Sequence, residues 1–228
     1  MVYKTLNTSA YEYLRDGILS GRIEPGRFYS ENQISKEIGI SRTPIRAALQ
    51  QLQQSKLIEI VPNKGFTVHT MTFRDVSETY QIRAAIEGFA ARKLAGDKSA
   101  EKKRELKKLE ALCAKQKTML EKPFDIDRFT GADEEFHETL VDYLGNDTLS
   151  DFYYNQMNKI YIICVNTFQV PERPVLAIKE HEAILAAIGS GNCDAAQNAV
   201  NYHMEKIMEM MDSIINKTKK TDMELIHK

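Results

Sequence analysis

The sequence predicts a mainly α-helical protein in two parts, residues 1–70 and 71–228. Apolar residues recur at helical spacing through most of the 228 residues. Two short runs rich in β-branched residues flank Pro62 to Gly65, which predicts a single β-hairpin at the end of the first part. From about Phe73 glycine and proline become sparse, and helical periodicity continues to about Lys217. We therefore expect a small mixed domain followed by an antiparallel all-α bundle of about six helices.

Composition and charge narrow the class of protein. The chain has no run of about 18 apolar residues and no signal-peptide core at its start, so we expect a cytoplasmic protein without a membrane partner. Its three cysteines, Cys113, Cys164 and Cys193, are dispersed without CxxC spacing and are interpreted as reduced thiols. Residues 1–70 hold nine Lys/Arg and six Asp/Glu, a net charge of +3, whereas residues 71–228 hold 22 and 26, a net charge of −4. A basic first part favours contact with phosphates.

The first part contains three expected helices. Residues 7–20 form the first, which Gly21 ends, and residues 27–29 form an extended segment beside the hairpin. Two shorter helices follow within residues 30–58. Ser30 is the expected N-cap of the earlier one, and Gly39 ends it because glycine tolerates a positive φ. The later helix begins near Ser41 or Thr43, with Pro44 in its first turn.

The later of these two helices has a polar face suited to DNA. Arg42 and Arg46 lie on it at helical spacing, opposite an apolar stripe. The arginine fork matches guanine edges and phosphates in the major groove. A helical hairpin with a solvated face is the alternative, but the β-hairpin that follows favours a winged helix-turn-helix. Lys64 at its tip would approach a phosphate, and Gly65 would let the backbone come close to the duplex.

These motifs carry a resemblance. Residues 7–70 resemble the DNA-binding domain of the GntR family of bacterial transcription regulators, through ILSGRIEPG, YSENQISKEIGISRTPIRAAL and NKGFTV. The resemblance implies that Arg42, Thr43, Arg46 and Gly65 contact the operator. Two positions depart from the family pattern: Asn32 stands where many members have a basic residue, and Ala47 where many have glutamate.

In the second part, polar side chains point inward on three expected helices. Asp133 and His137 are four residues apart on a helix near residues 125–144, so they share a face. His181 lies in line with apolar residues of the helix that Pro171 and Pro174 open, and His203 in the apolar row of the last helix. One inward histidine is more often a hydrogen-bonded core residue, but three with an aspartate are costly to bury without a cation.

This donor set predicts a divalent metal. Three neutral imidazoles and one carboxylate suit Zn²⁺ or Ni²⁺, with Mn²⁺ or Co²⁺ as alternatives. Residues 73–217 resemble the FCD effector domain of the FadR subgroup, through DEEFHETLVDYLGN, KEHEAIL and NYHMEKI. A count of six helices indicates its VanR-like branch. The resemblance implies that Asp133, His137, His181 and His203 are the metal ligands, and that a small organic acid completes the coordination.

Arg83, in QIRAAIEGFA, has two interpretations. The resemblance implies that it faces the pocket and pairs with an effector carboxylate. The alternatives are a local pair with Glu87, four residues later, or a contact at an interface.

Together these observations predict a homodimeric DNA-binding regulator, most simply a repressor. Its two winged helices would bind the half-sites of a short pseudo-palindromic operator in double-stranded DNA. A small carboxylate at the metal would shift the bundle between two arrangements. One alternative is an enzyme that uses the Asp/His₃ metal to activate water or oxygen, although no further inward acid or base accompanies the ligands. Another is a purely structural metal.

Overall fold

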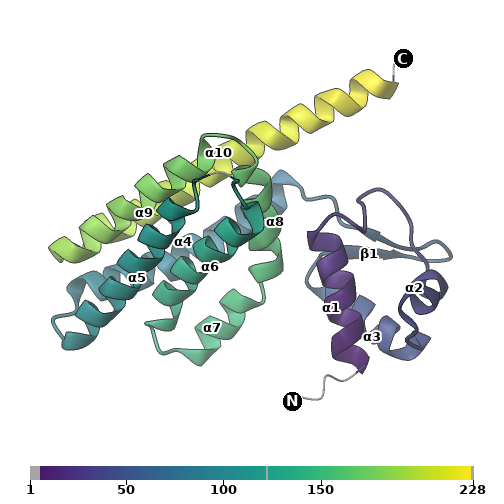
Figure 1. Ribbon diagram of the computed structural model, residues 1–228, viewed down its shortest axis with the longest axis horizontal. Helices are drawn as coiled ribbons and strands as arrows, with labels where there is room; N and C mark the ends of the chain where they lie inside the picture. The colour runs from purple at the N-terminus through teal and green to yellow at the C-terminus, as the bar shows by residue number, and fades with distance from the viewer. Residues whose placement is uncertain (1–5, 122, 227–228) are drawn as a thin grey trace. The chain divides into compact units, whose positions relative to one another are not determined.

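The computed structural model describes residues 6–121 and 123–226, which form ten helices and two strands (Figure 1). The chain divides into two compact units, Met1–Met71 and Thr72–Lys228. The boundary expected from the sequence, between residues 70 and 71, lies one residue from this division. Within the described ranges, none of the helices combines the length and apolar character that a membrane span requires.

The first unit is a helix-turn-helix followed by a hairpin. Its elements are α1 (Leu6–Leu19), α2 (Glu31–Ile38), α3 (Arg42–Gln54), β1 (Ile58–Val61) and β2 (Gly65–Val68). The strands are antiparallel, with Ile58 opposite Val68 and Val61 opposite Gly65. Tyr29 extends the pairing, because its N–H donates to the Phe66 carbonyl (2.8 Å) and its carbonyl accepts from the Phe66 N–H (2.9 Å). The expected winged helix-turn-helix is therefore present.

Local signals explain the ends of the two short helices. The Ser30 hydroxyl accepts the backbone N–H of Gln33 at 3.1 Å, and Gly39 closes α2 with a φ of 68°. Ser41 is the residue before α3, but its side chain makes no capping hydrogen bond. Pro44 lies in the first turn of α3, as expected, and its side chain is buried.

The second unit is a helical bundle in which α4 packs against α6, α9 and α10. Its elements are α4 (Phe73–Gly96), α5 (Ala100–Thr118), α6 (Ile126–Asp142), α7 (Asp147–Tyr154), α8 (Met157–Phe168), α9 (Arg173–Ser190) and α10 (Cys193–Ile226). The described part of this unit thus has seven helices, not about six. Periodicity in the sequence predicts one helix near residues 147–168, but the structure has two helices there. Gln156 N–H bonds the Tyr153 carbonyl (2.8 Å), a tight turn that ends α7.

The helix count bears on the resemblance. The assignment to the VanR-like branch rested on a count of six helices. The structure has seven described helices in this unit, so the count no longer supports that assignment. The break at Asn155 and Gln156 contains neither glycine nor proline, so the apolar period from Tyr153 to Ile160 continues across it in the sequence. Asparagine is a poor helix former, but that preference is too weak to locate a break.

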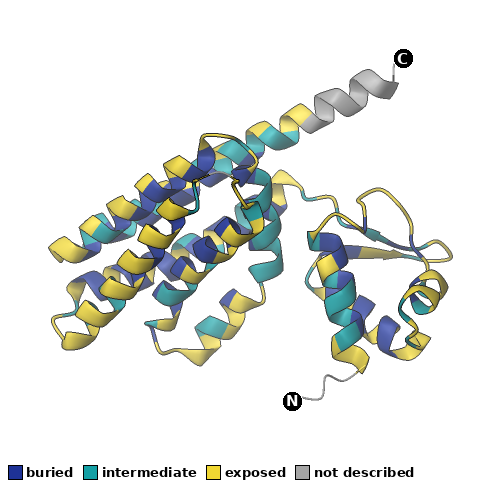
Figure 2. Cartoon of the chain, viewed as in Figure 1, coloured by how far each residue is buried: buried dark blue, intermediate teal, exposed yellow. Residues whose placement is uncertain are grey.

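Burial follows the predicted helical faces with two exceptions (Figure 2). Helical spacing in the sequence predicts that Phe89 and Phe152 point inward, but they are 50% and 51% exposed. The periodicity in the sequence predicts that the last helix ends near Lys217 and that the tail after it is frayed, whereas α10 continues to Ile226. Among the described residues, the core of the helical bundle in the second unit contains many buried polar side chains, three of them histidines.

Candidate functional site

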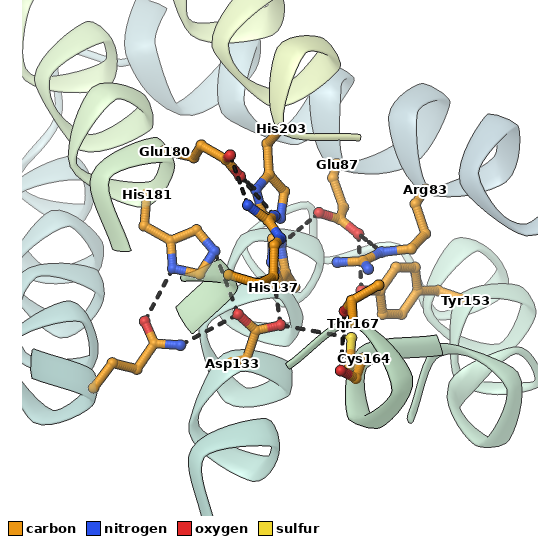
Figure 3. Close-up of polar contacts among 12 residues, drawn as sticks. Arg83, Glu87, Asp133, His137, Tyr153, Cys164, Thr167, Glu180, His181 and His203 are labelled. Carbon is orange, nitrogen blue, oxygen red and sulfur yellow. Dashed lines mark hydrogen bonds and ion pairs between the residues drawn. The ribbon is translucent and has the colours of Figure 1, made fainter. Parts of the chain in front are cut away.

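Three imidazoles meet inside the bundle. His137 on α6, His181 on α9 and His203 on α10 are all at most 1% exposed (Figure 3). One ring nitrogen from each lies within 4.8 Å of the others, a spacing that could hold a metal ion. The structure therefore brings together the three histidines that the sequence placed on separate inward faces.

Each of these imidazoles uses Nδ1 for a hydrogen bond to a buried side chain. His137 Nδ1 lies 2.6 Å from Glu87 Oε2, His181 Nδ1 lies 2.9 Å from Gln116 Oε1, and His203 Nδ1 lies 2.6 Å from Glu180 Oε2. All three Nε2 atoms are buried without a hydrogen-bond partner among the described residues. An acceptor at Nδ1 places the proton there and turns the Nε2 lone pair toward the common centre.

Asp133 completes the set of predicted ligands. It lies one turn before His137 on α6 and is 1% exposed. Its Oδ1 is 3.5 Å from His181 Nε2, and its Oδ2 is 3.8 Å from His137 Nε2. Gln116 holds it in place, because Gln116 Nε2 donates to Asp133 Oδ1 at 3.2 Å. These three imidazoles and this carboxylate are the donor types of a divalent metal site.

A second layer of charged groups surrounds the imidazoles. Glu87 accepts from Arg83 Nε at 2.6 Å and from the Tyr153 hydroxyl at 2.9 Å. Glu180 accepts both Nη atoms of Arg173 at 2.7 Å. The carboxylates that orient His137 and His203 are thus themselves held by buried arginines, as the outer layer of metal sites usually is.

The electrostatics keep two of the imidazoles neutral. Burial lowers the pKa of His203 to about 4, although the hydrogen bond that His203 Nδ1 donates to Glu180 acts in the opposite direction. Burial, with the charges of His203 and His137, holds the pKa of His181 well below its usual range. Burial alone would raise the pKa of Glu87, but Arg83 and His137 beside it bring that pKa far below its usual range. At neutral pH Glu87 and Glu180 are ionised and His181 and His203 are neutral, and the neutral imidazole is the form that coordinates metals.

Of the interpretations drawn from the sequence for Arg83, the local pair with Glu87 is confirmed, and pairing with an effector carboxylate stays a prediction. The local pair with Glu87 forms, and the guanidinium is fully buried. Its Nη1 and Nη2 nevertheless have no hydrogen-bond partner in the described part of the chain, and neither does the buried hydroxyl of Tyr80. The Tyr80 ring centroid lies 5.3 Å from Arg83 Cζ. Buried donors without acceptors are costly, so this corner of the site fits a small acceptor such as a carboxylate.

The residues present fit a resident metal. This fit is supported by three Nε2 atoms that are buried together. They carry no proton to donate, and no donor among the described residues bonds to them. Sequence reasoning missed Gln116, Tyr153, Arg173 and Glu180. Glu180 directly precedes His181 but lies on another face of α9, and Gln116 is 65 residues from its histidine. Only the tertiary packing shows these partners.

The residues predicted to contact DNA lie on the surface of the first unit. Arg42, Thr43 and Arg46 are exposed on α3, and Lys64 is exposed at the hairpin tip. Lys64 Nζ lies 5.4 Å from the ring centroid of Phe28, which is 45% exposed. The structure groups the three α3 residues on one surface of that helix, and their contact with DNA stays a prediction.

Gly65 has a reason within the domain to be glycine. Its φ is 101°, and a Cβ there would lie 2.1 Å from the Tyr29 carbonyl oxygen. That carbonyl accepts the Phe66 N–H, so it cannot easily move. The predicted close approach of DNA is therefore not needed to explain this glycine.

Comparisons with known proteins identify a family for each of the two units of the chain. Residues 78–206 match the model of the FCD domain, and residues 6–68 match that of bacterial regulatory proteins, gntR family. The HTH-type transcriptional regulator YdhC of Bacillus subtilis (strain 168) is 27% identical over 209 residues, which cover 92% of each chain. The HTH-type transcriptional repressor RspR of Escherichia coli (strain K12) is also 27% identical over 209 residues, 92% of this chain and 90% of RspR. A GntR transcriptional regulator from Rhodococcus sp. RHA1 shares the fold, with a TM-score of 0.72 at 21% identity over 90% of this chain and 97% of that one.

Proposed function

The chain belongs to the gntR family of bacterial regulatory proteins and carries an FCD domain. From this premise we propose how its helical bundle controls the binding of DNA. Its relatives are transcriptional regulators, so we set the enzyme alternative aside. In the proposal, a divalent metal and a small organic acid bind in the bundle and change the affinity of the winged helices for operator DNA. Repression that the acid relieves is the simplest form.

The observation that carries the proposal is the set of buried Nε2 atoms. His137, His181 and His203 would hold the metal, with Asp133 as the fourth ligand. The donor set suits Zn²⁺ or Ni²⁺, and Mn²⁺ or Co²⁺ as alternatives. When bound, such an ion supplies Lewis-acid positions that a carboxylate oxygen can occupy.

Arg83 supports a carboxylate as the effector. Its Nη1 and Nη2 are a pair of adjacent donors, the arrangement that binds a carboxylate with two parallel hydrogen bonds. Glu87 links Arg83 to His137, so an acid held by Arg83 would lie beside the imidazole cluster. Glu87 also prevents Arg83 from swinging away, because it fixes Nε.

We also propose that the regulator acts as a homodimer on a pseudo-palindromic operator. Two winged helices can then contact two half-sites related by the same two-fold axis. The α4–α7 surface, which we define by Ile82, Ala85, Ile86, Leu149 and Phe152, supports this. These residues line a surface pocket of about 530 Å³ that also includes Glu78 and Gln81. Phe89 continues the apolar surface on the next turn of α4.

The first experiment measures metal content. Wild type, His137→Ala and His69→Ala are purified without an affinity tag or chelator, loaded with Zn²⁺ or Ni²⁺, and analysed for metal. We expect about one metal per chain in wild type and its loss in His137→Ala, because removing one of three imidazoles breaks the donor set. His69 bonds Glu59 in the first unit, so His69→Ala is the matched control and should keep the metal.

The same preparations test the acid. Titration of the metal-loaded wild type with a panel of small mono-, di- and hydroxycarboxylic acids should give binding that Arg83→Gln weakens at least tenfold. If the metal binds but none of the acids binds to the metal-loaded protein, the role of the metal is purely structural. A wild type that takes up no metal under any loading condition would contradict the proposal as a whole.

A further inference from the structure

A carboxylate bridges the two arginines that face outward on α3. Glu31 is the first residue of α2, and its side chain is 26% exposed. Arg46 donates to it twice, from Nε to Oε1 at 3.1 Å and from Nη2 to Oε2 at 2.8 Å. Arg42 Nη2 donates to the same Oε2 at a longer 3.4 Å. Arg46 is therefore the arginine that Glu31 holds by two contacts.

These two contacts leave the end of the Arg46 fork open. A guanidinium carries five N–H donors, and Glu31 takes the one on Nε and one of the two on Nη2. Both donors on Nη1 and the second donor on Nη2 are not used by Glu31. A guanine edge in the major groove presents two adjacent acceptors, N7 and O6, which suit such a pair of donors. Arg46 can thus bind Glu31 through Nε and one Nη2 donor, and a base through Nη1 and the other Nη2 donor.

The ion pair contributes little to the packing of α2 on α3. Helices α2 and α3 pack against each other, and Ile34 on α2 and Ile45 and Leu49 on α3 are apolar residues that are each at most 2% exposed. Arg42 and Arg46 side chains are 56% exposed, and ion pairs in such positions add little stability. The effect of Glu31 is therefore on the conformation of Arg46 rather than on the fold.

We propose that Glu31 is a positioning residue that fixes the Arg46 guanidinium for reading a base pair, and so sets operator specificity. The inference rests on the assignment of α3 as the helix that reads DNA through Arg46. A long side chain that is already ordered loses less entropy when it binds a base. The carboxylate also repels phosphates, so it weakens binding to unrelated sequences, where Arg46 would otherwise contact the backbone.

The test compares specificity in a matched pair of variants. A duplex selected from a random pool by the wild-type protein serves as operator, and a scrambled duplex of equal length serves as unrelated DNA. Fluorescence anisotropy at one fixed salt concentration gives both affinities and their ratio. We expect Glu31→Gln to lower that ratio about three- to tenfold. Glu37→Gln makes the same charge change on α2, where Glu37 bonds Tyr13 instead, and should leave the ratio unchanged.

A double-mutant cycle shows whether Glu31 acts through Arg46. In an Arg46→Ala background, Glu31→Gln should no longer change the ratio. An unchanged ratio in Glu31→Gln alone, or an equal fall in both backgrounds, would overturn the inference. Thermal unfolding of each variant excludes a folding defect as the cause. If Arg46→Ala itself leaves operator affinity intact, the assignment of α3 fails, which is a separate result from a failure of Glu31.

Discussion

The two nitrogens of each buried imidazole have different tasks. Nδ1 bonds Glu87, Gln116 or Glu180, and Nε2 is left for the shared centre. A histidine that served only the core would be expected to use both nitrogens in hydrogen bonds. In these three rings the Nε2 atom has no hydrogen-bond partner among the described residues, and this supports the proposal that they are metal ligands.

The pKa values of these imidazoles predict how the metal-free protein responds to acid. In the folded state the pKa of His203 is about 4 because of burial, whereas in an unfolded chain it is about 6.5. Between these pH values the unfolded chain binds a proton that the folded chain does not, so the free energy of unfolding falls as pH falls. The His203 contribution amounts to about 3 kcal/mol, and His181 acts in the same direction.

Calorimetry of chelator-treated protein at pH 7, 6 and 5 measures this loss. The variant His203→Gln removes one of the titrating groups, so its stability should depend less steeply on pH than that of the wild type. Glu87 and Glu180 have pKa values that their partners lower despite burial, so the stability they contribute is constant above about pH 4.5 and is lost only below it. Equal slopes in wild type and variant would show that His203 is not the group that titrates.

The sequence could place the predicted metal ligands but not their hydrogen-bond partners. The spacing of Asp133 and His137 and the inward rows around His181 and His203 are local patterns, and helical periodicity preserves them. The partners of the imidazoles are different. Glu87 is 50 residues from His137, and Gln116 is 65 residues from His181. No period links residues so far apart, so these contacts exist only once the helices are packed.

Helix α4 shows which parts of an element a sequence determines. The sequence predicts a helix near residues 73–96, and α4 has these bounds because both ends carry local signals. Thr72 caps the start, where its side chain accepts the Asp75 N–H (3.2 Å) and Asp75 accepts the Thr72 N–H (3.0 Å). The segment that became α7 and α8 has no comparable stop, and there the sequence predicted one helix too few.

The exposed side of α4 leads to a prediction about assembly. Phe152 on α7 is 51% exposed and lines the α4–α7 surface, so a dimer that covers this surface would bury its ring. Phe152→Glu should convert the dimer to monomer in sedimentation experiments at micromolar concentration, because a buried carboxylate without a partner is costly. Leu176 on α9 is 41% exposed but is not among the residues that line this pocket.

Leu176→Glu is therefore the control and should remain dimeric. A dimer that persists in Phe152→Glu would place the two-fold contact elsewhere on the bundle. A wild type that sediments as a monomer would contradict the dimer itself. Circular dichroism of both variants confirms that the charge has changed assembly and not folding.

The imidazole cluster joins five helices. α6, α9 and α10 each supply a histidine, α4 supplies the carboxylate of Glu87, and α5 supplies the amide of Gln116. Anything that binds there contacts several helices at once, so it can favour one packing of the bundle over another. An acid can change DNA binding only if its affinity differs between the packing that binds DNA and the one that does not.

Because of that condition, the effects of the acid and the operator on each other's binding are reciprocal. If an acid weakens operator binding by some factor, operator DNA must weaken binding of the acid by the same factor, typically about 5- to 150-fold. Calorimetric titration of the metal-loaded protein with and without saturating operator measures one factor, and anisotropy with and without the acid measures the other. Arg83→Gln should reduce both together, because it removes the donors that hold the acid.

A mismatch between the two factors has a definite meaning. Acids such as citrate also chelate divalent metals, so an acid could release the operator by removing the metal instead of binding beside it. Operator affinity would then fall while bound acid is undetectable, and adding free metal would restore the affinity. Equal factors that survive excess metal can arise only if acid and operator bind the same protein and favour different arrangements of it.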